Sequence, residues 1–261
     1  MLVDSHCHLN YPGLRDDQAG VIERARAAGV GTMLGISTRA AEWDEVIGLA
    51  ATHDDIWASV GVHPHEADKH PDIDAARLID VAAHARVVAI GETGLDYHYD
   101  HSDRQCQRAS FRAHIAAART TGLPLIVHTR DAEADTAAIL ADEMGQGSFG
   151  GVIHCFTASA SFAEQALALG FSISFSGIVT FRNARDVQAV ASVIPFDRLL
   201  IETDSPFLAP IPMRGRPCEP AYIVHTAARL AELRGVSADV IADTTADNFF
   251  ALFAKARRPC G

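Results

Sequence analysis

Short apolar runs alternate along this chain with longer stretches of helical period, and this alternation limits the possible folds more than any other feature. The runs with strand character lie at 2–8, 31–36, 56–62, 87–91, 125–128, 151–154, 171–174 and 199–202. The helical stretches lie at 17–28, 39–52, 72–83, 103–121, 132–144, 159–169, 184–193, 219–233 and 238–254. Glycines suited to a left-handed helix end follow several of them, at Gly29, Gly122, Gly145, Gly170 and Gly235.

A strand followed by a helix, repeated eight times, closes most simply into a parallel barrel. We therefore predict an α/β fold, a TIM (β/α)8 barrel in which residues 1–261 form a single domain with an extra C-terminal helix at 238–254. An open, doubly wound sheet is the alternative, but it usually carries a glycine-rich phosphate loop after its first strand. This chain has His6 and His8 at that point, so we prefer the barrel.

Charge and cysteine content limit the partners and the compartment. Because the formal net charge is −11, a nucleic-acid or phosphate ligand needs a local basic rim or a metal ion to offset the surrounding field. The cysteines are odd in number and form no Cys-x-x-Cys pair, which is typical of free thiols in a reducing compartment; they are Cys7, Cys106, Cys155, Cys218 and Cys260. No leader-like or membrane-length apolar segment is present, so we expect a cytoplasmic protein without membrane contact. A monomer is a separate expectation.

His6 and His8 lie two residues apart at the end of the first predicted strand. Side chains alternate between the faces of a strand, so both imidazoles point to one side while Cys7 points to the other. Two imidazoles so placed can bind one divalent ion, although a His-x-His pair also occurs as an ordinary polar strand end. Further ligands elsewhere in the chain must decide between these interpretations.

Imidazoles and carboxylates recur at the ends of the other predicted strands. In a parallel barrel the C-terminal strand ends share one mouth, so residues far apart in sequence meet there. Histidine nitrogen together with carboxylate oxygen suits a divalent cation. The candidates, in chain order after His6 and His8, are His63, His65, Glu92, His128, His154 and Asp204.

This set predicts a pair of divalent metal ions, which could be Mg²⁺, Mn²⁺ or Zn²⁺. One ion is assigned to His6, His8, Glu92 and Asp204, and the other to Glu92, His128 and His154. Two ions about 3.5–4 Å apart can activate a water molecule and hold the attacking and leaving oxygens of a phosphodiester in line. Asp204 would accept the proton of that water as general base, so Asp204 and the bridging Glu92 are the predicted catalytic residues.

A carboxylate bridge is the natural choice for this chain. Many amidohydrolase-type enzymes bridge their metals with a carbamylated lysine instead. The lysines here are Lys69, in a predicted loop, and Lys255, at the end of the last predicted helix. Neither falls at a strand end, so Glu92 must bridge the ions if the site holds two.

Five blocks of sequence, spread from the first predicted strand to the last, are specific when taken together. They are Val-Asp-Ser-His-Cys-His at 3–8, Gly-Val-His-Pro-His at 61–65, Gly-Glu-Thr-Gly-Leu-Asp-Tyr at 91–97, His-Cys-Phe-Thr at 154–157 and Glu-Thr-Asp-Ser-Pro-Phe-Leu-Ala-Pro at 202–210. Together they resemble the signature of the TatD-type metal-dependent deoxyribonucleases, within the metallo-dependent hydrolase superfamily. The resemblance covers essentially the whole chain.

The resemblance implies a metal-dependent DNase with 3′-5′ exonuclease action and a role in DNA repair. DNA with single-stranded or damaged ends would then be the substrate. The chain departs from the family pattern at Ala158, where glycine is usual, and at Cys218, where asparagine is usual. Ala158 opens a helix and should change little, whereas Cys218 puts one polar contact near the mouth in doubt.

Three further residues are predicted to contact the substrate. The resemblance suggests that His63 touches a phosphate or the leaving group, and a structural loop histidine before Pro64 is the alternative. Arg214 and Arg216 lie in the proline-rich loop 210–217. Their guanidinium groups could bind phosphate and supply the local basic rim, or could lie on a solvated surface loop.

Four other residues receive predictions of lesser weight. Glu202 lies before Asp204 and could hold a metal-ligating histidine from behind, or could equally be a member of a buried ion pair. Phe156 could stack on a base, although ordinary loop packing is the more common role of such a residue. His101 and His114 are interpreted as surface or packing residues because they lie away from the predicted strand ends.

The predicted function is a metal-dependent deoxyribonuclease. One alternative keeps the metal centre and changes the substrate, giving an ester or amide hydrolase such as a deacylase acting on aminoacyl-tRNA, because an activated water also attacks a carbonyl carbon. Another alternative is a metal-stabilised binding or scaffold protein without turnover. The position of Asp204 as a general base counts against the latter.

Overall fold

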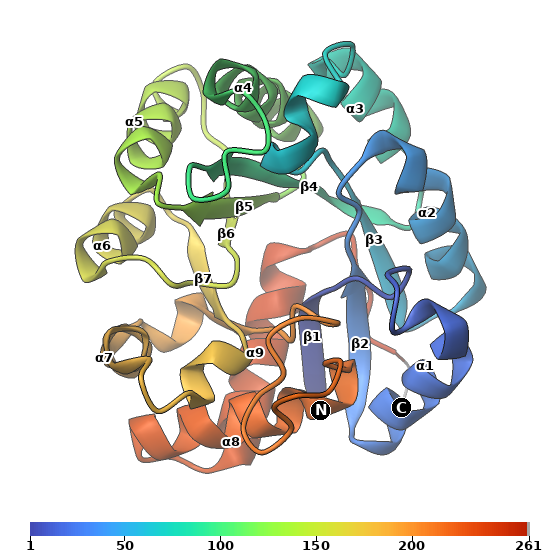
Figure 1. The fold of residues 1–261 in the computed structure, drawn as a ribbon, viewed down its shortest axis with the longest axis vertical. Coiled ribbons are helices and arrows are strands. Elements are labelled where there is room, and N and C mark those ends of the chain that lie inside the picture. The colour runs from blue at the N-terminus through green and yellow to red at the C-terminus, as the bar shows by residue number, and fades with distance from the viewer. Residues whose placement is uncertain (260–261) are drawn as a thin grey trace.

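The computed structural model describes residues 1–259, and its centre is a ring of eight parallel strands (Figure 1). The strands are β1 (Leu2–Cys7), β2 (Val30–Gly35), β3 (Ile56–Val60), β4 (Val87–Asp96), β5 (Leu125–Arg130), β6 (Gly151–Ile153), β7 (Ser172–Phe175) and β8 (Leu199–Ile201). Each strand pairs with the next along the chain. A parallel bridge between Cys7 and Ser205 joins the ends of the ring, and the His8 amide donates a 2.8 Å hydrogen bond to the Ser205 carbonyl. The predicted TIM (β/α)8 barrel is confirmed.

Helices surround the barrel on its outside (Figure 1). They are α1 (Gln18–Ala27), α2 (Trp43–Thr52), α3 (Ala75–Ala82), α4 (Arg104–Thr121), α5 (Glu133–Met144), α6 (Ala160–Ala168), α7 (Arg185–Val193) and α8 (Ile223–Arg234), followed by the extra helix α9 (Ala238–Leu252). Short 3-10 helices in the connections are η1 (Arg15–Asp17), η2 (Ala40–Glu42), η3 (Pro64–Lys69), η4 (Gly177–Thr180), η5 (Phe196–Arg198) and η6 (Pro220–Tyr222). Within residues 1–259 no helix combines the length and the apolar character needed to cross a membrane.

The glycines predicted to end helices have a positive φ with one exception. Gly29, Gly122, Gly170 and Gly235 do so. Gly145 has a φ of −64°, in the right-handed region, so that prediction was wrong. Helix α5 does end just before Gly145, but the positive φ comes two residues later, at Gly147, because the turn is longer than expected.

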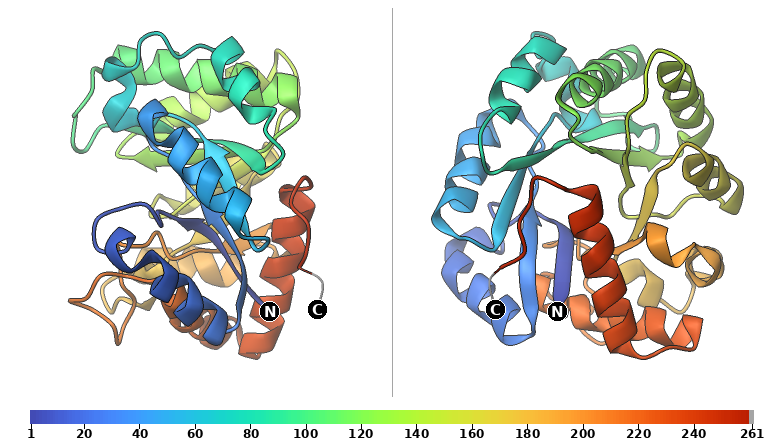
Figure 2. Two further views of the ribbon diagram at one scale, coloured as in Figure 1. Left: turned by 90° about the vertical axis from the view of Figure 1, so that its right-hand side faces the viewer. Right: turned by 180° about the vertical axis from the view of Figure 1, so that it is seen from behind.

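Helix α9 closes one end of the barrel and is part of the core. Seen from behind, it lies across the strands (Figure 2), and it contacts β1 and β8. Phe249 and Phe253 on this segment are fully buried in one cluster with Val3, Leu34 and Leu200. Burial of each aromatic ring stabilises the fold by about 1.5–3 kcal/mol. The helix thus fills the end where the strands begin and leaves the other end for a site.

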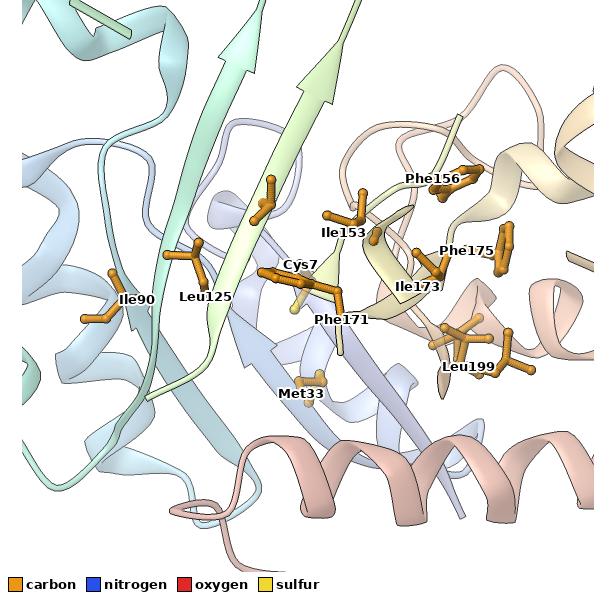
Figure 3. Packing of buried hydrophobic residues seen from close by; sticks show 14 of the residues in the cluster. Cys7, Met33, Ile90, Leu125, Ile153, Phe156, Phe171, Ile173, Phe175 and Leu199 are labelled. Atoms are coloured by element: carbon orange, nitrogen blue, oxygen red, sulfur yellow. The ribbon is translucent and has the colours of Figure 1, made fainter. Parts of the chain in front are cut away.

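The larger hydrophobic cluster lies between the strands and the surrounding helices, and Figure 3 shows part of it. Phe156 belongs to this cluster and is only 2% exposed. Its ring packs against Phe175, with ring centroids 5.9 Å apart, and against Phe162 of α6, with ring centroids 6.4 Å apart. Of the two interpretations of Phe156, packing is confirmed and base stacking is wrong, because the ring lies in the layer between strand and helix and does not face solvent.

Strand β4 is longer than predicted and is buried along its whole length. It continues past the predicted end at residue 91 to Asp96, so Glu92 lies within the barrel wall. Gly94 pairs with His128 of β5, and a Cβ atom on Gly94 would lie 2.0 Å from the His128 carbonyl oxygen. Glycine at this position therefore allows β4 and β5 to approach closely beside Glu92 and His128.

His114 on α4 supports the connection after β3. The ring is fully buried, as expected for a packing residue. Its Nε2 accepts a 3.0 Å hydrogen bond from the Val62 amide, and its Nδ1 lies 2.7 Å from the Ser110 carbonyl, to which it donates. Burial lowers the pKa of His114 to about 4, although the Ser110 carbonyl opposes this shift. The ring is therefore neutral at physiological pH.

We expect the protein to lose stability through His114 as the pH falls. An unfolded histidine has a pKa of about 6.5, so between this value and the folded pKa of about 4 the unfolded chain binds more protons and the free energy of unfolding rises with pH. Between pH 7 and pH 5 the contribution of His114 to the free energy of unfolding falls by about 2 kcal/mol. Urea unfolding of the wild type and of His114→Gln at both pH values measures it, because glutamine can still accept from the Val62 amide. An equal pH dependence of the two proteins would contradict the prediction.

Candidate metal centre

A cavity of about 550 Å³ opens at the end of the barrel where the strands finish. Its lining includes His8, His63, Glu92, His128, His154 and Asp204. His6 lies beneath this surface, fully buried and stacked on the His154 ring with centroids 3.9 Å apart. The structure therefore brings together every residue predicted to bind metal, from five different strand ends.

One oxygen of Glu92 faces the histidines of β1. The Oε2 atom lies 3.3 Å from His6 Nε2 and 3.9 Å from His8 Nε2, and the two Nε2 atoms are 3.3 Å apart. Asp204 Oδ1 lies 3.7 Å from His6 Nε2 and 3.4 Å from His8 Nε2. Two imidazole nitrogens and two carboxylate oxygens thus point at one small volume, which we call the first ligand group.

The other oxygen of Glu92 faces a different set of histidines. Its Oε1 atom lies 2.7 Å from His154 Nε2, 3.3 Å from His128 Nδ1 and 3.4 Å from His63 Nε2. His128 Nδ1 and His154 Nε2 are themselves 3.3 Å apart. Glu92, His128 and His154 form the second ligand group. Glu92 is therefore shared by the two groups through different oxygens, as a bridging carboxylate would be.

The spacing of these donor atoms fits a metal ion. Bonds of about 2.1 Å in tetrahedral geometry place neighbouring ligand atoms about 3.4 Å apart. In the first ligand group the measured distances between donor atoms run from 3.3 to 3.9 Å. The ligand atoms of His6, His8 and Glu92 all lie within 4.8 Å of one another. The first ligand group is therefore chemically and geometrically suited to a divalent cation, and the second supplies the same kinds of donor atom.

Both carboxylates of the site are ionised at neutral pH. Burial alone would raise the pKa of Glu92, but the charges of the surrounding histidines, His154 first, hold it well below its usual range. Burial would likewise raise the pKa of Asp204, and the hydrogen bond from His8 outweighs it and lowers the pKa. Ionised carboxylate oxygens are the form that binds a divalent cation, so both side chains are available as ligands.

Two further carboxylates orient the histidines of the second ligand group. Glu202 Oε1 lies 3.3 Å from His154 Nδ1, the contact predicted from its position before Asp204. Asp96 Oδ2 lies 3.0 Å from His128 Nε2. Each carboxylate accepts from one ring nitrogen and so leaves the lone pair of the other nitrogen directed at Glu92. Sequence reasoning gave Asp96 no such role, although its position four residues after Glu92 places both on one face of a strand.

His63 directs an N–H group at Glu92, whereas His128 and His154 direct a lone pair there. Its Nδ1 accepts a 3.1 Å hydrogen bond from the His65 amide, so the ring hydrogen lies on Nε2, the nitrogen that faces Glu92. Burial lowers the pKa of His63 well below its usual value, so the ring is neutral. A neutral ring with its hydrogen towards the cavity is suited to donate to a phosphate oxygen rather than to bind metal.

His65 lines the cavity, and the His101 ring packs against it from outside. His65 Nε2 lies 2.9 Å from Asp96 Oδ2, the same oxygen that His128 contacts. The His101 ring lies 4.8 Å from the His65 ring, centroid to centroid. His101 is exposed and does not line the cavity, so its interpretation as a surface or packing residue is confirmed.

The segment after β8 is held against β1 by a buried aspartate. Asp4 accepts a 2.6 Å hydrogen bond from the Thr203 hydroxyl and a 2.9 Å bond from the Thr203 amide. Asp204 follows with a φ of 56°, an uncommon conformation for a residue other than glycine, and its amide donates to the His6 carbonyl at 3.0 Å. Cys218, where the family usually has asparagine, lies buried behind this segment, its thiol 4.0 Å from the Thr203 carbonyl. The thiol also lies 3.9 Å from the Glu219 carbonyl, so its polar contacts are with backbone oxygens, one of them in the segment that carries Asp204.

The arginines at the cavity are not those that the sequence suggested. Arg214 and Arg216 are exposed and do not line the cavity, and the Arg214 guanidinium lies 4.2 Å above the Phe181 ring. Arg39 and Arg130 line it instead. Arg39 follows β2 and Arg130 is the last residue of β5, and this nearness to strand ends is the signal that could have found them. The proposed phosphate contacts of Arg214 and Arg216 stay a prediction.

A (β/α)8 barrel with imidazoles and carboxylates gathered at its C-terminal mouth is the architecture of the metal-dependent hydrolases. Residues 3–254 match the model of the family described as TatD related DNase, and the chain belongs to that family.

Individual relatives match over nearly their whole length. The metal-dependent hydrolase YcfH of Escherichia coli (strain K12) is 45% identical over 97% of this chain and 95% of its own. A protein of Rahnella sp. (strain Y9602) named 3′-5′ ssDNA/RNA exonuclease TatD is 38% identical over 93% of this chain and 94% of its own. The crystal structure of YJJV, a TatD homologue from Escherichia coli K12, superposes with a TM-score of 0.90 at 31% identity, covering 97% of this chain and 98% of that one.

Proposed function

We propose that this metal-dependent hydrolase is a nuclease that cleaves DNA phosphodiester bonds and removes nucleotides from the 3′ end of single strands. The observation that carries the proposal is the shared carboxylate of Glu92, whose two oxygens face two separate ligand groups. A site for paired ions suits in-line displacement at a phosphodiester. The relative from Rahnella named as a 3′-5′ exonuclease supports the same reaction.

The ligand groups define which residues would hold each metal ion. His6, His8, Glu92 and Asp204 would hold one, and Glu92, His128 and His154 the other. When bound, a pair of Mg²⁺, Mn²⁺ or Zn²⁺ ions supplies Lewis acidity for the phosphate and acidifies the attacking water.

The side chains around the ions have distinct tasks. Asp204 is ionised and lines the cavity, so it accepts the proton of the attacking water. His63 donates its Nε2 hydrogen to a phosphate oxygen. Asp96 and Glu202 hold the ligand histidines in one tautomer.

The proposal is tested by incubating the purified protein with 5′-labelled single-stranded DNA and, side by side, with aminoacyl-tRNA. We expect stepwise shortening of the DNA from its 3′ end with added Mg²⁺ or Mn²⁺, and none in EDTA. Release of the amino acid from tRNA with intact DNA would establish the deacylase alternative instead. DNA that binds but stays uncut after prolonged incubation with metal would establish a binding protein.

Asp96→Asn should weaken metal binding without unfolding the protein. Asparagine keeps the size of the side chain, but it replaces one carboxylate oxygen by an NH₂ group that cannot accept from His128. Loss of such an orienting carboxylate lowers metal affinity about 10- to 100-fold. Titration of the metal-free protein with Zn²⁺ by calorimetry measures this, and Asp68→Asn, an exposed aspartate on η3, is the control. Unchanged affinity in Asp96→Asn would contradict the orienting role.

Several other expectations remain untested predictions. They are the role in DNA repair, the preference for damaged ends, the monomeric state, the cytoplasmic location and the organisation of residues 1–261 as a single domain.

A further inference from the structure

The cavity has two chemically different walls on opposite sides of the ligand groups. The apolar wall consists of Tyr11, Ile178, Phe207 and Leu208, which follow β1, β7 and β8. The cationic wall consists of Tyr99, Thr129 and Arg130, at the ends of β4 and β5. β1 and β5 are four strands apart in a ring of eight, so the walls face one another across the site.

Phe207 presents an exposed aromatic ring at the apolar wall. Half of the residue's surface is accessible (50%), although its ring contacts Tyr11 edge to face with centroids 6.1 Å apart. The backbone on either side is constrained, because Asp204 and Leu208 have φ values of 56° and 55°. Gly177 packs so tightly here that a Cβ on it would lie 2.2 Å from the Leu208 carbonyl oxygen. A large apolar ring held in solvent by a strained segment is typical of a binding site.

Arg130 presents an uncompensated positive charge at the cationic wall. Within residues 1–259 its guanidinium makes no ion pair with a carboxylate, whereas Arg39, the other arginine of the cavity, pairs with Glu42 at 3.0 Å. Tyr99 holds Arg130 in place, with the guanidinium carbon 4.8 Å from the ring centre and Nη1 3.4 Å from the hydroxyl. The Tyr99 amide in turn donates to Asp96 at 3.0 Å. The guanidinium is thus positioned for an anionic ligand.

We infer that the two walls bind consecutive parts of one nucleic-acid strand, with a base stacked on Phe207 and a backbone phosphate paired with Arg130. This inference rests on the proposed nuclease function and specifies its substrate contacts. A strand that spans the mouth from one wall to the other lays the intervening phosphodiester over Glu92. The apolar wall can stack any base, so the contact selects single strands without selecting sequence.

The test pairs each protein variant with a substrate that lacks the matching group. Single-stranded DNA is prepared with one abasic nucleotide, or with one uncharged methylphosphonate, at each of the last three positions. With normal DNA, Phe207→Ala should lower kcat/KM about 5- to 150-fold, the range expected for one base–aromatic stack, while Phe207→Trp stays close to wild type. Arg130→Ala should lower it about tenfold, and Arg130→Lys less.

The decisive result is that each variant no longer responds to the one substrate change that removes the group its missing side chain would contact. Phe207→Ala should cleave normal DNA and DNA abasic at one position equally, whereas the wild type distinguishes them. Arg130→Ala should be indifferent to a methylphosphonate at one position and keep its sensitivity to the abasic change. Binding of the same DNAs in EDTA, measured by fluorescence anisotropy, should show the same pattern.

Two controls separate this inference from the proposed function. Phe196→Ala removes a ring that is 39% exposed at the opposite end of the barrel, and Arg77→Ala removes an arginine on α3 that pairs with Asp80. Both should behave as wild type. If wild-type protein cleaves DNA with metal but the Phe207 and Arg130 variants keep wild-type sensitivity to every substrate change, the two-wall inference is overturned and the nuclease stands. If DNA is neither bound nor cleaved, both are overturned.

Discussion

Glu92→Gln is expected to lower kcat for DNA hydrolysis at least about 1000-fold and to reduce bound metal in both ligand groups, because loss of a shared anionic ligand removes several kcal/mol of charge stabilisation. Glutamine is nearly isosteric, but it offers one carbonyl oxygen and one NH₂ group where the two groups each need an oxygen. Glu92 Oε2 faces His6 and Oε1 faces His154. Either orientation of the glutamine amide therefore places its NH₂ group against one of these histidine nitrogens. Metal content by mass spectrometry and single-turnover cleavage measure the two effects.

A matched control for Glu92→Gln is Glu143→Gln. Glu143 is also a buried glutamate with cationic partners, since it pairs with Arg112 and Arg119, but it lies on α5 outside the barrel. The control should lose stability and keep both its metal content and its kcat. Glu92→Gln protein that retains wild-type metal content and cleaves DNA at the wild-type rate would rule out a bridging role.

Asp204→Asn is expected to lower kcat about 100- to 10,000-fold, the range for loss of a general base. The lowered pKa of Asp204 keeps the wild-type side chain ionised at neutral pH. A base acts only when deprotonated, so wild-type activity should fall as the pH drops through that lowered pKa. Asparagine has no proton to gain or lose there, so this acid limb of the rate profile should disappear in the variant.

Asp131→Asn is the control for backbone conformation in the Asp204 experiment. Asp131 has a φ of 51°, close to the 56° of Asp204, and it lies at the rim beside His98. If an Asp-to-Asn change in the left-handed region were itself disruptive, Asp131→Asn would also be disruptive. We expect instead that the kcat and the pH profile of Asp131→Asn match those of the wild type. An acid limb that persists unchanged in Asp204→Asn would assign the base to another residue.

The sequence by itself was sufficient for the barrel and for naming candidate ligands that the structure brings together. Strand and helix periods are local properties of the chain, and eight repeats of the same unit have few ways to close. The positions of His6, His8, Glu92 and His154 relative to strand ends are also local, and the topology of a parallel barrel brings all such ends to one mouth. Candidate ligands could therefore be named without knowing any distance between them.

Only the tertiary structure decided how each side chain is used. Phe207 faces the cavity and Phe156 does not, because they lie on different sides of the barrel strands. Arg130 lines the mouth and Arg214 does not, because of how the connections fold. The division of Glu92 between two ligand groups, and the contact of Asp96 with His128, depend on the twist and close approach of β4 and β5. Such contacts join residues across the barrel, and their geometry is set by packing of the whole ring, which no local pattern encodes.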